Sequence, residues 1–185
     1  MVPEGKLEDR GSGLQPASEG WFVVNVRDAQ WLTSEDGEKR PTGSECPFES
    51  HEHWFRQYAI RIHVLPPGQP NGLYHAENAQ EDFIVLSGEC TLLVEGEERM
   101  LRQWDFFHSP PGTEHIFVGA GDGPCAILMV GARSDNEQIR YPASEFAARY
   151  DASVETETND PDEAYADFEP SRRERPSYWD QLPWA

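Results

Sequence analysis

The sequence predicts an all-β protein whose core is a barrel of two antiparallel sheets. Between residues 58 and 130, runs of about five to eight residues rich in β-branched and aromatic side chains are separated by turn signals roughly every ten residues. Short strands in such close succession are typical of sandwiches and barrels. The run at residues 124–130 is nearly all apolar, which indicates a strand covered on both faces.

Length and charge exclude several classes of protein. The 185 residues suffice for one good core and leave too little for a second domain of ordinary size. A net charge of -19 argues against nucleic acid as a partner, because phosphate binding needs clustered Lys and Arg. No apolar run is long enough to cross a membrane, and residues 1–20 lack the apolar segment of a signal peptide. We therefore expect an acidic cytoplasmic protein that binds no nucleic acid and no membrane.

The N-terminal part of the chain is expected to add little to the core. Residues 1–20 are rich in Gly, Glu, Ser and Pro, and we expect them to be disordered. Residues 21–57 are expected to supply N-terminal strands and a loop that pack on the barrel. Within them, residues 21–26 are a strand candidate, and residues 33–50 are a long loop or a strand-loop-strand excursion.

Residues 58–132 are expected to form the barrel itself. The strand at 58–65 alternates, with Ile60, Ile62 and Val64 on one face and Arg61 and His63 on the other, so we expect His63 to be an outward or cross-strand residue. A hairpin is expected around residues 95–98, where glycine lies in the turn. The expected strands, in chain order, are residues 58–65, 81–86, 90–94, 99–101, 104–108, 116–118 and 124–130.

Residues 133–185 are expected to lie outside the barrel. Residues 142–150 predict a short amphipathic helix, in which Phe146 and Tyr150 are four apart on one side. Residues 151–169 are acidic and poor in apolar groups, so they are expected to be extended or mobile. The segment 178–184 carries two tryptophans, a tyrosine and a leucine, which are too apolar to remain in water. We expect this end to dock on its own barrel or on a second subunit.

Four residues form a candidate metal site. His75 and Glu77 are two apart, so on an extended strand both point to the same face. Glu81 follows a short polar break and begins the strand that carries Phe83 and Val85. His115 enters the strand at 116–118, directly after a Pro-Pro-Gly turn at 110–112. The pair His51 and His53 is a weaker candidate, and we expect it to lie in a surface turn, because no partner pair follows with zinc-site spacing.

These motifs resemble the cupin superfamily, of the small single-domain, conserved-barrel type. A first cupin motif reads glycine, a spacer, His-x-His, three or four residues, Glu, six residues and Gly, and His75, Glu81 and Gly88 match it. A second reads Gly, five residues, Pro-x-Gly, two residues and His, and Pro110, Gly112 and His115 match it. Glu77 stands at the second histidine of the first motif, and Trp104 stands at the first glycine of the second.

The resemblance covers roughly residues 58–132. It implies a jelly-roll barrel, or double-stranded β-helix, with an N-terminal extension and a C-terminal helix and tail around it. It also implies one divalent metal ion, a small-molecule ligand and a homodimer.

The ligand types narrow the chemistry of this site. Two neutral imidazoles and one carboxylate on one face of a metal leave open positions for water or substrate, a set well known with non-haem iron. If Glu77 ligates as well, two carboxylates balance the charge of a divalent ion and favour iron or manganese, with zinc, nickel or cobalt as further options. If Glu77 turns aside, it is placed to act as a general base.

Three functions remain open. In the first, the chain is a metal-dependent enzyme that acts on a small organic molecule by oxygenation, isomerisation or decarboxylation. In the second, it binds a metabolite or a metal without turnover. In the third, its metal is purely structural. For the enzyme, the site residues are His75, Glu77, Glu81 and His115, with Glu77 also catalytic. Phe83, Val85, Phe106 and Phe117 are candidates to line the cavity.

Overall fold

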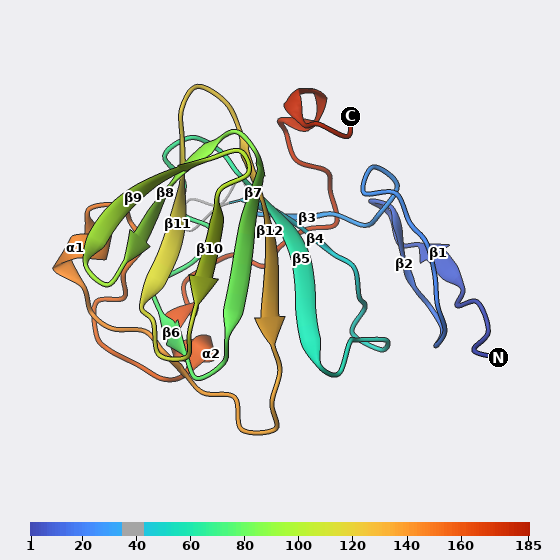
Figure 1. The fold of residues 1–185 in the computed structure, drawn as a ribbon, viewed down its shortest axis with the longest axis horizontal. Helices are drawn as coiled ribbons and strands as arrows, with labels where there is room; N and C mark the ends of the chain where they lie inside the picture. Colours follow the sequence, from blue (N-terminus) through green and yellow to red (C-terminus); the bar gives the residue numbers. More distant parts are fainter. Residues whose placement is uncertain (35–42) are drawn as a thin grey trace.

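The structure, a computed structural model that describes residues 1–34 and 43–185, consists mainly of two facing antiparallel sheets (Figure 1). The larger sheet has the strand order β10-β7-β12-β5-β4-β3, and the smaller has the order β11-β8-β9. The larger sheet comprises β3 (Leu32–Thr33), β4 (Ser44–Pro47), β5 (Tyr58–Leu65), β7 (Glu81–Ser87), β10 (Phe106–Ser109) and β12 (Cys125–Ala132). The smaller comprises β8 (Glu89–Val94), β9 (Glu97–Arg102) and β11 (His115–Ala120). The prediction of an all-β protein of two antiparallel sheets is confirmed.

Two short strand pairs lie beside these sheets. One joins β1 (Leu7–Asp9) to β2 (Leu14–Pro16), and the other joins β6 (Ala76–Glu77) to β13 (Ile139–Arg140). The helical elements are short: α1 (Glu145–Ala148), α2 (Pro161–Ala164) and the 3-10 turn η1 (Trp179–Gln181). In the part of the chain that the structure describes, no helix has the length and apolar character needed to span a membrane.

The space between the two sheets holds the main core. Alternation along β7 turns Phe83 and Val85 inward, where both are almost fully buried, while Leu86 packs on the opposite side of the sheet. Strand β12 does the same with Ile127 and Met129 inside and Ala126 outside. Both faces of β12, near the middle of the larger sheet, are therefore covered, as its nearly continuous apolar run indicates.

Two tight turns need a left-handed backbone. The β8-β9 hairpin turns at Glu95 and Gly96, with φ of 49° and 76°, the double positive φ that a two-residue turn of this kind requires. Trp104, which stands at the motif's usual glycine, has a φ of 75° and donates its backbone N–H to the Val85 carbonyl at 2.8 Å. The turn thus keeps a glycine-like backbone, at a cost of about 1–2 kcal/mol for a residue with a Cβ.

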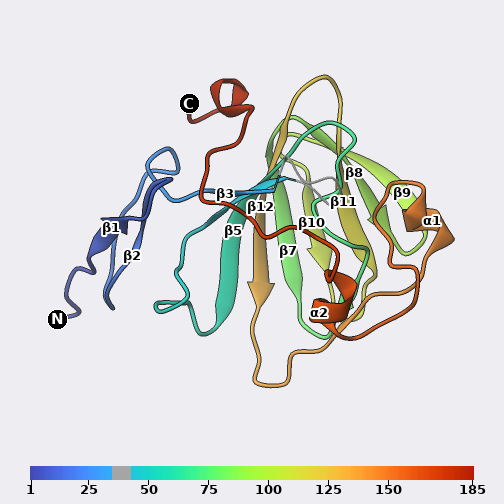
Figure 2. The same ribbon diagram turned by 180° about the vertical axis from the view of Figure 1, so that it is seen from behind.

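The N-terminus differs from the disorder expected for residues 1–20. The β1-β2 hairpin lies beside the barrel, and its backbone bonds to the following segment: Gly5 N–H to the Trp21 carbonyl and Leu14 N–H to the Asp28 carbonyl, both at 2.8 Å (Figures 1 and 2). Main-chain hydrogen bonds, rather than apolar burial, give this segment its structure, which is why composition alone predicted the opposite.

The segment between the hairpin and the barrel also differs in part from prediction. The expected strand at 21–26 is wrong, because only a single bridge between Trp21 and Glu4 forms there. The strand-loop-strand alternative is borne out by β3 and β4, which pair and extend the larger sheet, while residues 35–42 lie outside the described residues.

The aromatic C-terminal segment docks on its own chain. Trp31, fully buried, is the centre: the Trp184 ring stacks on it at 5.6 Å and the Trp179 ring meets it edge-on at 5.7 Å. Leu182 is buried in the same cluster, which covers Ile62 and Val64 on the outer face of β5. Figure 2 shows the segment returning along that side of the barrel.

The two helices cover the other outer surfaces. Helix α1 is shorter than the helix expected at 142–150, and the Ser144 hydroxyl caps it by accepting from the Ala147 N–H. Helix α2 falls within residues 151–169, which were expected to be extended or mobile. Asp160 caps α2, and Tyr165 and Phe168 pack beside the buried Leu73 and Tyr141, so local capping and a few apolar contacts order this acidic segment.

Deleting residues 176–185 is expected to lower the melting temperature by about 5 °C or more, because Trp31 loses its two aromatic partners and the Leu182 contact. Thermal unfolding followed by circular dichroism measures the effect. Met100→Ala, which removes an exposed side chain on β9, is the control and should leave the melting temperature unchanged. A deletion variant as stable as the full chain would contradict docking on the barrel.

Candidate metal centre

Two histidines are held side by side by backbone pairing. His75 and His115 form an antiparallel bridge: His115 N–H donates to the His75 carbonyl at 2.9 Å, and His75 N–H donates back at 3.3 Å. His75 immediately precedes β6, and His115 is the first residue of β11. Directly paired residues on adjacent strands project to the same face, so the two imidazole centroids lie 5.1 Å apart.

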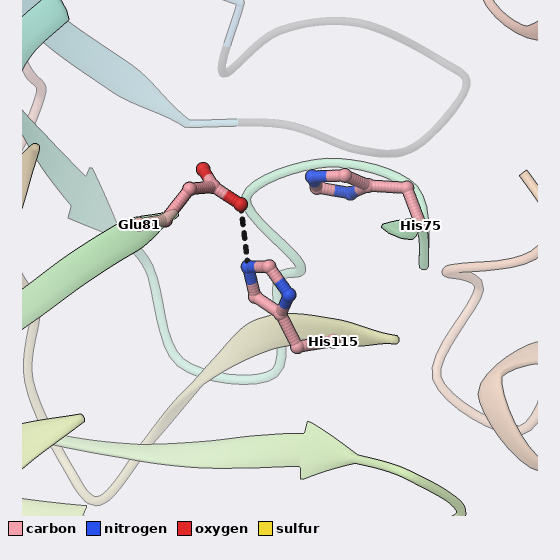
Figure 3. Close-up of side chains that lie close together, drawn as sticks. All are labelled: His75, Glu81 and His115. Atoms are coloured by element: carbon pink, nitrogen blue, oxygen red, sulfur yellow. Dashed lines mark ion pairs between the residues drawn. The ribbon is translucent and has the colours of Figure 1, made fainter. Parts of the chain in front are cut away.

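The carboxylate that completes the cluster comes from the facing sheet. Glu81 is the first residue of β7, and its Oε2 lies 3.4 Å from Nε2 of His115 (Figure 3). One possible ligand atom each from His75, Glu81 and His115 lies within 4.8 Å of the others. The structure thus brings together three of the four residues predicted for the site, from three separate stretches of sequence.

Backbone carbonyls set the orientation of both imidazoles. His75 Nδ1 lies 2.6 Å from the Leu73 carbonyl, and His115 Nδ1 lies 3.1 Å from the Thr113 carbonyl. A carbonyl can only accept a hydrogen bond, so each Nδ1 carries the proton and each neutral ring keeps its lone pair on Nε2. This is the arrangement that metal-ligating histidines use.

Burial favours the neutral forms of these side chains. It lowers the pKa of His115 to about 4, with His75 adding to the effect, and it lowers the pKa of His75. Burial also raises the pKa of Glu81 to about 8, reinforced by the charge of Glu77 and opposed by that of Arg61. At neutral pH and without a cation, both imidazoles are uncharged and Glu81 retains a proton.

Glu77 lies next to this cluster rather than within it. Its Oε1 is 3.9 Å from Nε2 of His75, and its side chain is the most exposed of the four, at 31%. Burial raises the pKa of Glu77, and the neighbouring Glu137 contributes. The geometry therefore places Glu77 within reach of the site while leaving its role as a ligand a prediction.

The donor set fits a metal ion. Each histidine turns an unprotonated Nε2 toward a carboxylate, His115 toward Glu81 and His75 toward Glu77, so the groups that converge are all acceptors when the carboxylates are ionised. Converging acceptors repel one another in a poorly solvated space unless a proton or a cation lies between them. Imidazole and carboxylate together suit iron, manganese, zinc and related divalent ions.

A cavity of about 310 Å³ opens onto these residues. Phe83 and Phe117 line it, as predicted, but Val85 lies deeper in the core between the sheets. The prediction that Phe106 lines the cavity is wrong. Its side chain is 62% exposed, because it pairs with Ile84 on the outer face of β7. Its neighbour Phe107 turns inward instead and stacks on Phe83.

Two further polar residues, Arg61 and His63, line the same cavity. His63 is a cross-strand neighbour of Glu45, as one part of the prediction states, but it does not face outward. The apolar face of β5 is covered by the C-terminal segment, so the polar face is the one inside the barrel. The sequence shows the alternation of apolar and polar residues along β5. It does not show that the C-terminal segment covers the apolar face.

The weaker histidine pair stays outside the site. His51 and His53 lie in a bend, and His53 Nδ1 is 3.6 Å from Glu19. Within residues 1–34 and 43–185, the His75, Glu81 and His115 group is the one cluster with metal-ligand geometry.

A tyrosine beyond the barrel supports His75 indirectly. The Tyr165 hydroxyl accepts a hydrogen bond from the Leu73 N–H at 3.0 Å. The carbonyl of Leu73 in turn accepts the hydrogen bond from His75 Nδ1. Tyr141 also contacts His75, with ring centroids 5.9 Å apart. No local sequence pattern links these tyrosines to the site, because their position depends on how residues 141–168 wrap the barrel.

Solved structures with the same fold carry different descriptions. A sugar phosphate isomerase of the cupin superfamily from Silicibacter pomeroyi aligns with a TM-score of 0.55 at 21% identity, over 67% of this chain and 83% of that one. A predicted oxalate decarboxylase from Thermotoga maritima aligns with a TM-score of 0.52 at 19% identity, over 61% of this chain and 100% of that one.

A candidate sugar phosphate isomerase from Acidithiobacillus ferrooxidans aligns at 23% identity and a TM-score of 0.49, over 54% of this chain. The present chain spans only 64% of that protein's length. A search of curated proteins finds no match.

The family comparison agrees with these structural likenesses. The Cupin domain family model matches residues 61–131, which run from β5 into β12 and include all four predicted site residues. Identities below 25% carry the fold and no activity. Together with the two facing antiparallel sheets, the family match shows that residues 61–131 form a cupin-type domain, as the resemblance in the sequence predicts.

Proposed function

We propose that this chain is a metal-dependent enzyme that acts on a small organic molecule. The observation that carries the proposal is the convergence of His75, Glu81 and His115 within 4.8 Å, at the wall of a cavity of about 310 Å³. Three protein ligands leave further coordination positions for water or substrate, which distinguishes a catalytic site from a closed structural one. The cavity volume is at the lower end of the range for ligand sites, so it suits a small substrate.

His75, Glu81 and His115 would hold one divalent ion, with iron or manganese favoured. Such an ion supplies Lewis acidity toward a bound oxygen atom of water or substrate. The ring contacts of Phe83 and Phe107 with His115, at 5.2 and 5.7 Å, surround that imidazole with apolar surface and limit water on this side. Two solved structures of this fold are described as a sugar phosphate isomerase and a predicted oxalate decarboxylase, and this difference selects no single reaction. The proposal therefore covers oxygenation, isomerisation and decarboxylation.

Glu77 is placed both to coordinate the metal and to transfer protons to or from the substrate. It lines the site cavity and also a larger hollow of about 860 Å³ outside it, so it stands between the site and solvent. We propose that its carboxylate joins the ligand set and exchanges protons with the substrate when it is not coordinated. With Glu77 and Glu81 both ionised, two negative charges balance a divalent cation.

Replacing either histidine is expected to remove the metal and leave the barrel folded. His75→Ala and His115→Ala should bind less than about a tenth of the metal held by the wild type, because loss of one imidazole leaves an incomplete and weaker set of ligands. Elemental analysis of purified protein measures this, and His51→Ala, which alters an exposed histidine, is the control. Full metal retention in either variant would refute the site.

Replacing Glu77 by histidine is expected to change which metal binds. Glu77→His should shift selection toward zinc, nickel or copper when protein is loaded from an equimolar mixture, because imidazole is a softer ligand than carboxylate. Elemental analysis again gives the result, with Glu137→His as a control at the neighbouring carboxylate of the same cavity. An unchanged metal profile would exclude Glu77 as a ligand and leave it the proton-transfer role.

Metal affinity is expected to rise with pH until about pH 8. Glu81 holds a proton below that pKa of about 8 and must release it to ligate, whereas His115, with a pKa of about 4, is already neutral. The affinity should therefore increase about tenfold per pH unit near neutrality, measured by calorimetry with a competing chelator. In Glu81→Gln the rise between neutrality and pH 8 should be lost along with most of the affinity. A flat wild-type profile would mean that Glu81 is already ionised.

A further inference from the structure

A guanidinium lies in the cavity that contains the proposed metal ligands. Alternation along β5 sends Ile62 and Val64 to the outer cluster and turns Arg61 to the same side as Leu65, which belongs to the core between the sheets. Arg61 lines the cavity together with His75, Glu81 and His115. Its positive charge is close enough to lower the pKa of both Glu77 and Glu81. Arg61 therefore faces the proposed metal site.

Glu45 holds this guanidinium in place. Arg61 Nη1 donates to Glu45 Oε2 at 3.0 Å, and His63 Nε2 lies 3.5 Å from the same oxygen. Burial lowers the pKa of His63 to about 4, so the imidazole is neutral and Arg61 is the cation that pairs with Glu45. A guanidinium carries five N–H donors, and among the described residues the Glu45 bond is the one hydrogen bond that the Arg61 side chain makes. Most of its donors remain for a ligand.

The second arginine of the cavity has more of its donors engaged than Arg61. Arg133 forms a two-point pair with Glu49, through Nη1 at 3.0 Å and Nη2 at 2.6 Å, and Nη1 also donates to the Phe55 carbonyl at 2.6 Å. Arg133 thus joins β12 to the segment before β5. Of the two arginines, Arg61 therefore keeps more donors for a ligand.

The charged residues that line the cavity limit where an anionic group of a ligand could bind. Three carboxyl groups line it, those of Glu77, Glu81 and Glu137, and in their ionised forms they repel an anionic ligand. An anion can enter only where cations compensate, at a bound metal and at Arg61. A guanidinium matches the two oxygens of a carboxylate in a planar, two-point hydrogen bond.

We propose that Arg61 binds the carboxylate of a small hydroxy acid or oxo acid, whose neighbouring hydroxyl or carbonyl oxygen reaches the metal. The assignment rests on the proposed function, because the metal supplies the second point of attachment. It narrows the substrate from small organic molecules in general to carboxylates that fit a cavity of about 310 Å³.

Lactate and lactamide form a matched pair of probes. They share size and the 2-hydroxyl, and they differ in that an uncharged amide replaces the carboxylate. Equilibrium dialysis with each radiolabelled probe, on metal-loaded and on metal-stripped protein, gives the dissociation constants. The proteins compared are the wild type, Arg61→Gln, Arg61→Lys and the control Arg99→Gln, which removes an exposed arginine on β9.

Wild-type protein is expected to bind lactate more tightly than lactamide. Arg61→Gln should weaken lactate binding about tenfold or more and leave lactamide binding unchanged, because the lost hydrogen bonds are charge-assisted. Arg61→Lys, which keeps the charge without the planar fork, should fall between the two and guards against a folding defect in Arg61→Gln. Arg99→Gln should bind both probes as the wild type does, and metal content should be the same in all four proteins.

The outcomes separate this proposal from the proposed function. Equal lactate affinity in wild type and Arg61→Gln, or no lactate binding by the wild type, would overturn the role of Arg61 even if the metal is bound. Failure to bind any metal would instead overturn the proposed function. An Arg61-dependent preference for lactate in metal-stripped protein would then still support the carboxylate site.

Discussion

The backbone pairing of His75 with His115 is the constraint on which the candidate site depends. Two reciprocal hydrogen bonds hold two residues, forty apart in sequence, at adjacent positions. The carbonyls of Leu73 and Thr113, each two residues before its histidine, then direct both Nε2 atoms toward the cavity. The imidazoles are positioned by main-chain groups that the sheets require in any case, so the site needs few specialised side chains to orient it.

The barrel buries a cluster of side chains whose ionised forms would repel one another. Unprotonated Nε2 atoms and carboxylates face one another in a space where burial already disfavours charge on His75, Glu81 and His115. The apolar core between the sheets is formed mainly by other residues, among them Phe83, Val85 and Ile127, and His115 packs at its edge against Phe83. Stability is supplied by the core, and the acceptor cluster is left free to take up a cation.

Segments outside the cupin-type domain complete this arrangement. The C-terminal aromatic segment covers the apolar face of β5, which makes the opposite face of that strand, with Arg61 and His63, part of the cavity wall. Tyr165 holds the Leu73 amide from another part of the same C-terminal region. The polarity of the cavity therefore depends on residues that the family match does not include.

The sequence by itself determined the main strands of the barrel, the hairpin at Glu95 and Gly96, and the positions of the ligand candidates, because strand alternation, turn residues and motif spacing are local properties. Only the tertiary structure decided that Glu77 lies beside the cluster rather than in it, that Phe107 and not Phe106 turns inward, and that Arg61 faces the site. It also decided that residues 7–9 and 14–16 form strands and that residues 161–164 form a helix. These outcomes depend on cross-strand register and on which segment covers each face, and both arise from contacts between residues far apart in the chain.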